Sequence, residues 1–272
     1  MREDYAEPHY NRANVLKDQR QWEAALTGYD RAIELKADYA EAFSNRGFAL
    51  HELGRLDEAL ASCNRAVEIK PIFAEAYCNR GNLLLAVQRL DEALASFDRA
   101  VALRPDYASG RVNRALASLL AGEYEKGWTE YEWRWEDATS WVINEKRHFP
   151  QPLWLGHVPL AGKTILLQSE QGYGDTLQFC RYVKLVADLG ARVILEVPKA
   201  LSTLLTSLEG LTQIIVHGEK LPAFDYYCPL LSLPLTMNTT LSSIPAQVRY
   251  LAARGARPAS AATGVGAPRR RH

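Results

Sequence analysis

The pattern of hydrophobic positions divides the chain into two parts. Up to about residue 135, small and apolar residues recur every three or four positions, which predicts paired amphipathic helices. From Thr164 onward, short apolar runs alternate with helical segments. In this second part, the pattern predicts strands at 164–169, 192–197, 213–217 and 224–230. It predicts helices at 175–189 and 199–208. We therefore expect a helical region followed by an α/β region with a parallel, doubly wound sheet.

The helical region is built from a repeat. Residues 40–73 and 74–107 match at an offset of 34 positions, including Gly47 with Gly81 and the run of residues that begins at Arg55 and at Arg89. The same register extends back to 6–39 and, more loosely, forward to 108–135. Repeats of this length stack as helical hairpins, because one hairpin alone cannot bury its apolar stripe. The glycines are expected to let the two helices of a hairpin approach closely.

One asparagine recurs with the repeat. At 100° per residue it points away from the two buried positions that flank it, so four carboxamides are expected to line the open side of the first helices, at Asn11, Asn45, Asn79 and Asn113. A carboxamide has both a donor and an acceptor and can hold the backbone of an extended peptide. These are the predicted peptide-binding residues. The alternative is that asparagine merely suits a solvated helix face.

An arginine follows each of these asparagines, at Arg12, Arg46, Arg80 and Arg114. Its position is one where apolar residues are usual in such repeats. Two interpretations remain open: the guanidinium groups pair with acids of the following helix, or they present charge to a partner. Residues 122–135 then close the helical region with five aromatic residues. This cap either covers the last repeat, docks it on the next domain, or stacks on a carbohydrate.

A glycine-containing turn follows the first predicted strand of the α/β region. It supplies a candidate ligand loop made of Glu170, Gln171, Gly172, Gly174 and Thr176, together with Asp175 at the start of the next helix. Ligands of such sheets sit at the carboxyl ends of the strands, and free N–H groups at a helix start bind phosphate or hydroxyl oxygens. Asp175 is either a catalytic carboxylate or a helix cap. The turn lacks the third glycine of a dinucleotide fingerprint, which argues against an oxidoreductase.

Three resemblances sharpen this picture. The 34-residue period, with its early small residue and late Pro71 and Pro105, resembles the tetratricopeptide family. The asparagine placement resembles the superhelical repeats of the O-linked N-acetylglucosamine transferases, whose asparagines grip substrate polypeptide. The segments EQGYGDTLQFCRY and FDYYCPLLSLP resemble the glycosyltransferase-like region that follows such repeats in many bacterial proteins and is related to heptosyltransferases. That resemblance implies the N-terminal lobe of a two-lobed (GT-B) enzyme, Rossmann-like in fold, with Asp175 as general base.

We therefore expect four regions, namely a repeat solenoid at 1–135, a connector at 136–161, a GT-B N-terminal lobe at 162–252 and a disordered tail at 253–272. The second lobe, which holds the sugar nucleotide in the family, is missing, so the chain resembles a truncated enzyme that is inactive alone. The expected function is protein interaction through the groove of the repeats. The alternative is transfer of a sugar from a nucleotide sugar to a protein or glycan acceptor. A lone lobe also exposes the face meant for its partner, which favours self-association.

Composition and charge limit the kinds of partner and the cellular compartment that we expect. Lys and Arg together number 32, as do Asp and Glu, so no overall charge attracts nucleic acid. No apolar run reaches the length of a membrane span and the N-terminus lacks a secretory signal, so we expect a cytoplasmic protein. The four cysteines show no CxxC spacing and are expected to be buried free thiols without a metal. No cofactor is expected, with a nucleotide sugar as substrate only if the chain is active.

Overall fold

The computed structural model describes residues 5–246 and 250–251. The tail expected from residue 253 onward therefore lies outside the described residues. Two compact units divide the chain: the first comprises residues up to His148 together with Ser232–Ile244, and the second comprises Phe149–Leu231 and the residues from Pro245. The division differs from the sequence-based boundaries at Ser232–Ile244, which were expected in the α/β region.

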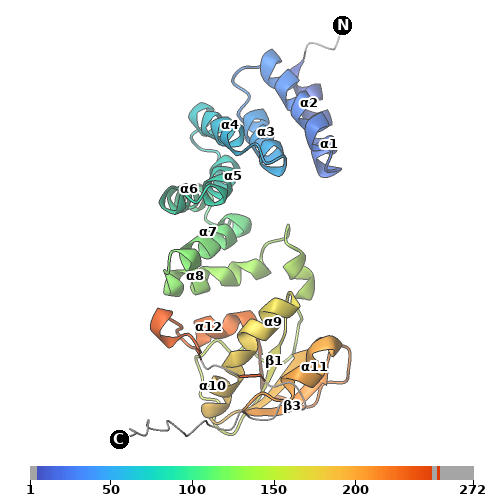
Figure 1. The fold of residues 1–272 in the computed structure, drawn as a ribbon, viewed down its shortest axis with the longest axis vertical. Coiled ribbons are helices and arrows are strands. Elements are labelled where there is room, and N and C mark those ends of the chain that lie inside the picture. Colours follow the sequence, from blue (N-terminus) through green and yellow to red (C-terminus); the bar gives the residue numbers. More distant parts are fainter. Residues whose placement is uncertain (1–4, 247–249, 252–272) are drawn as a thin grey trace, which may run out of the picture. The chain divides into compact units, whose positions relative to one another are not determined.

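The first unit begins with helical hairpins that follow the 34-residue period (Figure 1). The helices pair as α1 Ala6–Asp18 with α2 Trp22–Leu35, α3 Ala40–Glu52 with α4 Leu56–Ile69, α5 Ala74–Ala86 with α6 Leu90–Leu103, and α7 Ala108–Leu120 with α8 Tyr124–Tyr131. Each hairpin contacts the next one, and the first helices of successive hairpins also contact each other. The predicted helical solenoid is confirmed.

The turn inside each hairpin contains one residue in the left-handed region. The φ angles are 58° at Arg20, 74° at Gly54, 60° at Gln88 and 84° at Gly122. Glycine adopts this conformation without strain, whereas a side chain there costs about 1–2 kcal/mol. The first and third turns therefore hold a strained residue where the second and fourth hold glycine.

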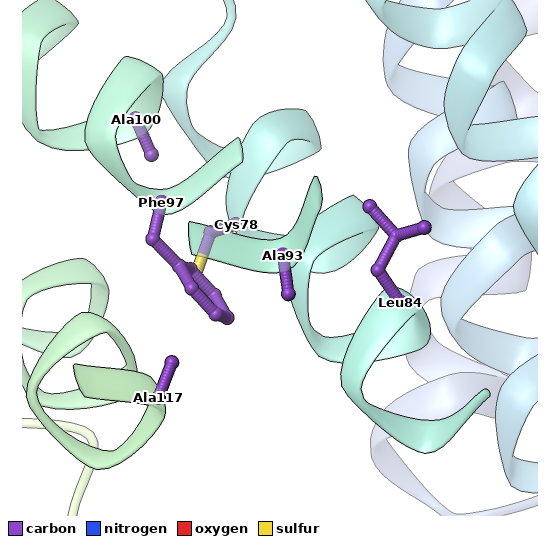
Figure 2. Close-up of a cluster of buried hydrophobic side chains, with 6 residues drawn as sticks. All are labelled: Cys78, Leu84, Ala93, Phe97, Ala100 and Ala117. Carbon is purple, nitrogen blue, oxygen red and sulfur yellow. The ribbon is translucent and has the colours of Figure 1, made fainter. Parts of the chain in front are cut away.

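Gly47 and Gly81 lie where the two helices of a hairpin meet. A Cβ added at Gly47 would lie 2.5 Å from the sulfur of Cys63, and one added at Gly81 would lie 2.5 Å from the ring of Phe97. Figure 2 shows Phe97 in a cluster of buried side chains with Cys78, Leu84, Ala93, Ala100 and Ala117. The expected packing role of these two glycines agrees with this geometry.

Residues after α8 close the helical unit. The 3₁₀ segments η1 Glu132–Trp135 and η2 Trp141–Glu145 follow α8, and the short helix α12 Leu233–Thr236 contacts α8. Ser232 donates to Glu132 Oε1 at 2.8 Å and accepts from Arg134 Nη2 at 2.9 Å. These bonds explain why Ser232–Ile244 belongs to the first unit, although about a hundred residues of sequence separate the partners.

The aromatic cap stacks on arginine side chains of the same unit. The guanidinium of Arg111, on α7, lies 4.4 Å from the ring centroid of Trp133. That of Arg134 lies 4.9 Å from the Tyr131 ring and 4.6 Å from the Trp135 ring. The cap therefore covers the last hairpin, which is one of its three expected roles.

The second unit contains a parallel sheet whose described strands are β1 Thr164–Gln168, β2 Arg192–Val197, β3 Leu211–Val216 and β4 Tyr226–Pro229, in the order β3-β2-β1-β4. All adjacent pairs are parallel, with Thr164 opposite Arg192 and Ile165 opposite Tyr226. Central β1 is almost entirely buried, as a sheet covered on both faces requires. The predicted parallel sheet is confirmed at this level. Residue Leu153, in the expected connector, forms a parallel bridge with Tyr227.

The crossovers of the sheet differ from the sequence-based prediction in one place. A single helix at 175–189 was wrong: the structure has α9 Tyr173–Phe179, a 3₁₀ turn Cys180–Tyr182 and α10 Val183–Asp188. Side chains three apart eclipse each other in a 3₁₀ turn, which lets Phe179 and Tyr182 stack with their centroids 6.3 Å apart. The second crossover helix, α11 Lys199–Leu205, lies within its predicted range.

The four cysteines are free and buried, at positions 63, 78, 180 and 228. Burial raises the pKa of the Cys63 thiol to about 12 and that of the Cys180 thiol to about 12. Within the described ranges, no helix is both long and apolar enough to cross a bilayer.

Candidate functional site

The first helices of the hairpins each present one stripe of side chains around the recurring asparagine. Residues four before, three after and seven after a helical position lie within about 60° of it. We call the resulting surface the asparagine face, made of Glu7, Asn11, Asn14 and Asp18 on α1, Glu41, Asn45, Phe48 and Glu52 on α3, Glu75, Asn79, Asn82 and Ala86 on α5, and Ser109, Asn113, Leu116 and Leu120 on α7. All of these residues are exposed or half-buried.

Three carboxamides of the asparagine face are anchored through their nitrogen atoms. Asn45 Nδ2 donates to Asn14 Oδ1 at 2.9 Å and to the Tyr10 hydroxyl at 3.1 Å. Asn79 Nδ2 donates to Ser44 Oγ at 3.0 Å, and Asn113 Nδ2 donates to Cys78 Sγ at 3.3 Å. Each bond reaches the first helix of the preceding hairpin, 35 residues back in three cases and 31 residues back for the bond from Asn45 to Asn14. The asparagines therefore join neighbouring repeats, a role that sequence reasoning missed.

The carboxamide oxygens of these three asparagines, unlike the nitrogens, are not used in the described contacts between repeats. Within the described part of the chain, no residue donates a hydrogen bond to Oδ1 of Asn45, Asn79 or Asn113. All three side chains are half-buried, and Asn11, which has no earlier hairpin to bond to in this structure, is exposed. The anchored nitrogens fix the orientation of the amides, so the oxygens form a row of acceptors. The acceptor half of each carboxamide therefore remains for a ligand, together with the second N–H of Asn79 and of Asn113.

Three of the arginines each connect three helices, and among the described residues Arg114 alone of these three pairs with an acid of the following helix, Glu130, as one of the two interpretations expects. Arg46 donates to Asp30 Oδ1 at 2.6 Å and to Ser62 Oγ at 2.9 Å. The bonds of Arg80 and Arg114 are equivalent, to Asn64 and Ser96 and to Asp98 and Glu130. Every partner lies 16 residues before or after the arginine. This arginine ladder, formed by Arg46, Arg80 and Arg114, holds the second helices of adjacent hairpins together, while Arg12 is exposed.

Ion pairs neutralise two of the acids in the middle of the asparagine face, Glu41 and Glu75. Glu41 lies 2.6 Å from Lys70 Nζ, and Glu75 lies 2.7 Å from Arg104 Nη1. The pKa of the Glu41 carboxyl is lowered: burial acts to raise it, and the hydrogen bond from Lys70 outweighs that effect together with backbone bonding and nearby lysines. At α1, the Tyr10 and Tyr39 rings pack with their centroids 4.9 Å apart. Burial raises the pKa of Tyr39, and the charge of Glu7 adds to the shift.

The carboxyl edge of the sheet brings together residues that follow β1, β3 and β4. Ser169 Oγ lies 2.9 Å from His217 Nε2, a pair that nothing in the sequence indicated beyond the position of each residue directly after a strand. Glu170 is buried, and its Oε1 accepts from the backbone N–H of Leu231 at 3.1 Å. Glu170, expected in the ligand loop, therefore ties the end of β1 to the end of β4.

The rest of the predicted ligand loop starts α9. Asp175 Oδ2 accepts from the Gly172 N–H at 3.2 Å, and Thr176 Oγ1 donates to the Gly172 carbonyl at 3.2 Å. Both contacts belong to helix capping, the alternative role considered for Asp175. Gln171 has φ 62°, so it occupies the left-handed region next to the glycine. A Cβ at Gly174 would meet no atom within 4 Å, so the surface above this residue is open.

Comparison with protein families bears on the helical hairpins. The family model described as TPR repeat matches residues 13–54, and the model described as tetratricopeptide repeat matches residues 40–73 and 74–107. The chain carries tetratricopeptide repeats. These matches agree with the repeat boundaries read from the sequence. They give no support to the glycosyltransferase-like resemblance of the α/β region.

Three solved structures whose titles name TPR domains or proteins are similar to part of the chain. The Arabidopsis OM64 TPR domain is 27% identical, with 43% of this chain and 98% of that one covered and a TM-score of 0.42. YrrB, titled a TPR protein with an unusual peptide-binding site, is 22% identical over 52% of this chain and 73% of its own, with a TM-score of 0.44. The first TPR of Spaghetti (RPAP3), bound to an HSP90 peptide, is 22% identical over 44% and 96%, with a TM-score of 0.42. No curated protein matches the chain.

A cavity of about 1120 Å³ lies beside the last helical hairpin, formed by α7 and α8. The turn before α8, α8 itself and Thr240–Ser242 line it, and a second hollow of about 360 Å³ adjoins it at Tyr124, Glu125 and Thr129. Residues 240–242 lie beside α8 because Ser232–Ile244 packs on the helical unit, and no pattern in the sequence predicts that packing. This cavity could not have been found from the sequence.

Proposed function

We propose that the helical unit binds an extended polypeptide segment along the asparagine face. The observation that carries this proposal is the row of carboxamide oxygens of Asn45, Asn79 and Asn113, each held in place through its own nitrogen. An extended backbone offers N–H donors at regular intervals, and it can use such acceptors without any demand on its side chains. Asn11 supplies a fourth carboxamide at the exposed end of the row.

Helix spacing sets the length of the bound segment. Packed helices lie about 8–10 Å apart, and an extended chain advances about 3.3 Å per residue. Roughly three residues of the ligand therefore pass each repeat. A segment of roughly ten residues reaches from Asn11 to Asn113.

The test uses a library of random peptides displayed on phage and selected against the full chain, followed by affinity measurement of selected peptides. The variant Asn45→Ala with Asn79→Ala should weaken binding by about 2 kcal/mol, or roughly 30-fold, because two net hydrogen bonds to the ligand are lost.

Ser44→Ala is the matched control. It removes the anchor of Asn79 and keeps the carboxamide oxygen. We expect it to lower thermal stability with a smaller effect on affinity. Equal losses of affinity in the control and in the double variant would reject the role of the oxygens.

A second function is proposed for the α/β unit, that of a glycosyltransferase-like lobe acting on a protein or glycan acceptor. The supporting observation is the strand order β3-β2-β1-β4, in which the connections leave β1 in opposite directions and the turn at Gly172–Thr176 follows β1. Ligands bind at such a switch point in open parallel sheets. In this proposal Asp175 takes a proton from the acceptor hydroxyl, a nucleotide sugar is the donor, and the remaining lobe belongs to a longer form of the protein or comes from another chain.

The substitution Asp175→Asn tests this second function. Asparagine keeps an oxygen that can accept from the Gly172 N–H, so the helix cap survives, but the amide cannot accept the proton. Binding of UDP-, GDP- or ADP-sugars to the full chain is measured first by calorimetry, and transfer is then compared in the wild type and the variant. Unchanged transfer by the variant would refute the proposal.

A further inference from the structure

The asparagine face changes its chemistry from one end to the other. On α1, the stripe carries the carboxylates of Glu7 and Asp18, both exposed. On α7, the residues three repeats later at the positions of Asn14 and Asp18 are Leu116 and Leu120. These leucines are 48% and 71% exposed, although the same helix buries other apolar side chains against its neighbours. One end of the face is therefore acidic and the other apolar.

The exposed acids of the asparagine face lie towards the α1 end: Glu7 and Asp18 on α1 and Glu52 on α3, with none on α5 or α7. The corresponding acids of the middle repeats, Glu41 and Glu75, are paired with Lys70 and Arg104 across 29 residues. Among the described residues, the equivalent partner of Glu7, Lys36, makes no ion pair with it within 4.0 Å and lies over the Tyr39 ring at 4.6 Å. The face therefore keeps an unneutralised carboxylate next to the tyrosines of the first hairpin.

The other charges of α1 lie off the stripe. Arg12 is rotated by about 100° from Asn11, and Lys17 by about 120° in the opposite direction. Lys17 pairs with its neighbour Asp18 at 3.4 Å, and both side chains reach solvent. An exposed pair of this kind contributes little, so Asp18 remains available to a cation of a ligand.

We propose that the polypeptide bound on the asparagine face carries basic side chains over α1 and apolar side chains over α7. This inference rests on the proposed peptide-binding function and names the chemistry of the partner. Glu7 and Asp18 lie at opposite ends of α1, about 16 Å apart along the helix axis, so each meets its own basic side chain of the ligand, and the one at Glu7 lies beside the Tyr10–Tyr39 aromatic pair. An apolar side chain covers Leu116 and Leu120 and removes their exposed surface from water. With roughly three residues per repeat, the two groups are roughly nine residues apart in the ligand.

Synthetic peptides test this proposal on the full chain by fluorescence anisotropy. The probe has two arginines and two leucines separated by a Gly/Ser/Asn spacer of the stated length, made in both chain orders. One comparison peptide has glutamates in place of the arginines, and another has serines in place of the leucines. The arginine–leucine peptide should bind in one of the two orders, about tenfold more tightly than the serine peptide, since one or two apolar side chains are buried. The glutamate peptide should bind more weakly at low salt.

Variants then locate the two contacts. Glu7→Gln with Asp18→Asn should weaken the arginine–leucine peptide about threefold at low salt and have no effect at high salt. Leu116→Ser with Leu120→Ser should weaken it about tenfold at any salt concentration. These side chains are exposed, so folding is preserved.

Matched controls lie outside the asparagine face. Leu189→Ser changes a leucine that is 46% exposed in the other unit, and Glu23→Gln with Asp57→Asn removes two exposed acids of second helices. Controls that weaken binding as much as the test variants would overturn the proposal. If all peptides bind equally and Asn45→Ala with Asn79→Ala still weakens them, the inference falls and peptide binding stands. If no peptide binds, both fall.

Discussion

Substituting Gly81 with alanine tests whether the spacing of a hairpin is set by this residue. The added Cβ would lie 2.5, 2.7 and 2.8 Å from three ring atoms of Phe97. Ordinary contact begins at about 3.4 Å, so the ring would have to move by about 1 Å. Phe97 is fully buried, and Ala117 of the next hairpin belongs to the same cluster, so the ring has little room to withdraw (Figure 2).

Two effects of opposite sign decide how much Gly81→Ala changes the free energy of unfolding. Alanine is favoured over glycine inside a helix by about 1 kcal/mol. Overpacking of a well-packed core costs about 1–3 kcal/mol. We therefore expect Gly81→Ala to lower the free energy of unfolding by about 1 kcal/mol. In a Phe97→Ala background the clash is gone, so the same substitution should raise it by about 1 kcal/mol.

Urea denaturation followed by helical circular dichroism measures both changes, and hydrogen exchange of peptides from α5 and α6 shows whether they are local. Phe97→Ala alone creates a cavity and is expected to cost about 3–5 kcal/mol, so the comparison is made within each background. The reasoning is refuted if Gly81→Ala has the same sign in both backgrounds.

Three further predictions follow from the turns, the arginine ladder and a buried thiol. Gln88→Gly should raise the free energy of unfolding by about 1 kcal/mol, and Gly54→Ala should lower it by a similar amount. Both residues have left-handed backbone angles, and a Cβ at Gly54 would touch no other atom, so backbone strain alone is tested. Urea denaturation that shows changes of the same sign for the two variants would contradict this. Arg114→Gln should cost about 2 kcal/mol, because the largely buried Glu130 carboxylate is left with its longer ion pair to Arg111 Nη1 at 3.3 Å, and thermal denaturation should show a smaller loss in a Glu130→Gln background. Burial raises the pKa of Cys63 to about 12 from 9.0, so the stability that comes from the neutral thiol is present below pH 9 and is lost as pH rises towards 12. At pH 8, iodoacetamide should label this thiol only at the rate of local opening, and fast labelling by mass spectrometry would be evidence against burial.

The helical hairpins could be predicted nearly to the residue, and the reason is their period. Two repeats share so many residues that small and apolar positions define the start of α3 and α5, and the register then extends to the outer hairpins. The strands were also predictable, because β1 and β2 are continuous apolar runs. The break of the helix at Cys180 could not be predicted, because the pattern of apolar residues continues through the 3₁₀ turn. The break accompanies the packing of Phe179 with Tyr182.

The candidate site was predictable in position and less so in chemistry. Helix geometry placed the asparagines on one face, but it could not show that Asn79 Nδ2 bonds to Ser44, since that bond depends on how two hairpins pack. The same holds for Glu170, whose side chain turns inward to the Leu231 N–H and not to the open edge of the sheet. The packing of Ser232 on Arg134 joins residues 98 positions apart and has no periodic signal.

The constant spacing of the arginine ladder makes the repeats interchangeable units. Asp30 stands in its repeat where Asn64 stands in the next, so a deletion of residues 40–73 would bring Arg80 to Asp30 at the separation now found between Arg46 and Asp30. Asn79 would meet Tyr10 in the same way, as Asn45 does now. After such a deletion the new junction would hold an arginine bond and an asparagine bond of the kinds now found between the first two hairpins. The number of repeats, and with it the length of the surface that a partner can contact, can in this sense change independently of the bonds that join neighbouring hairpins.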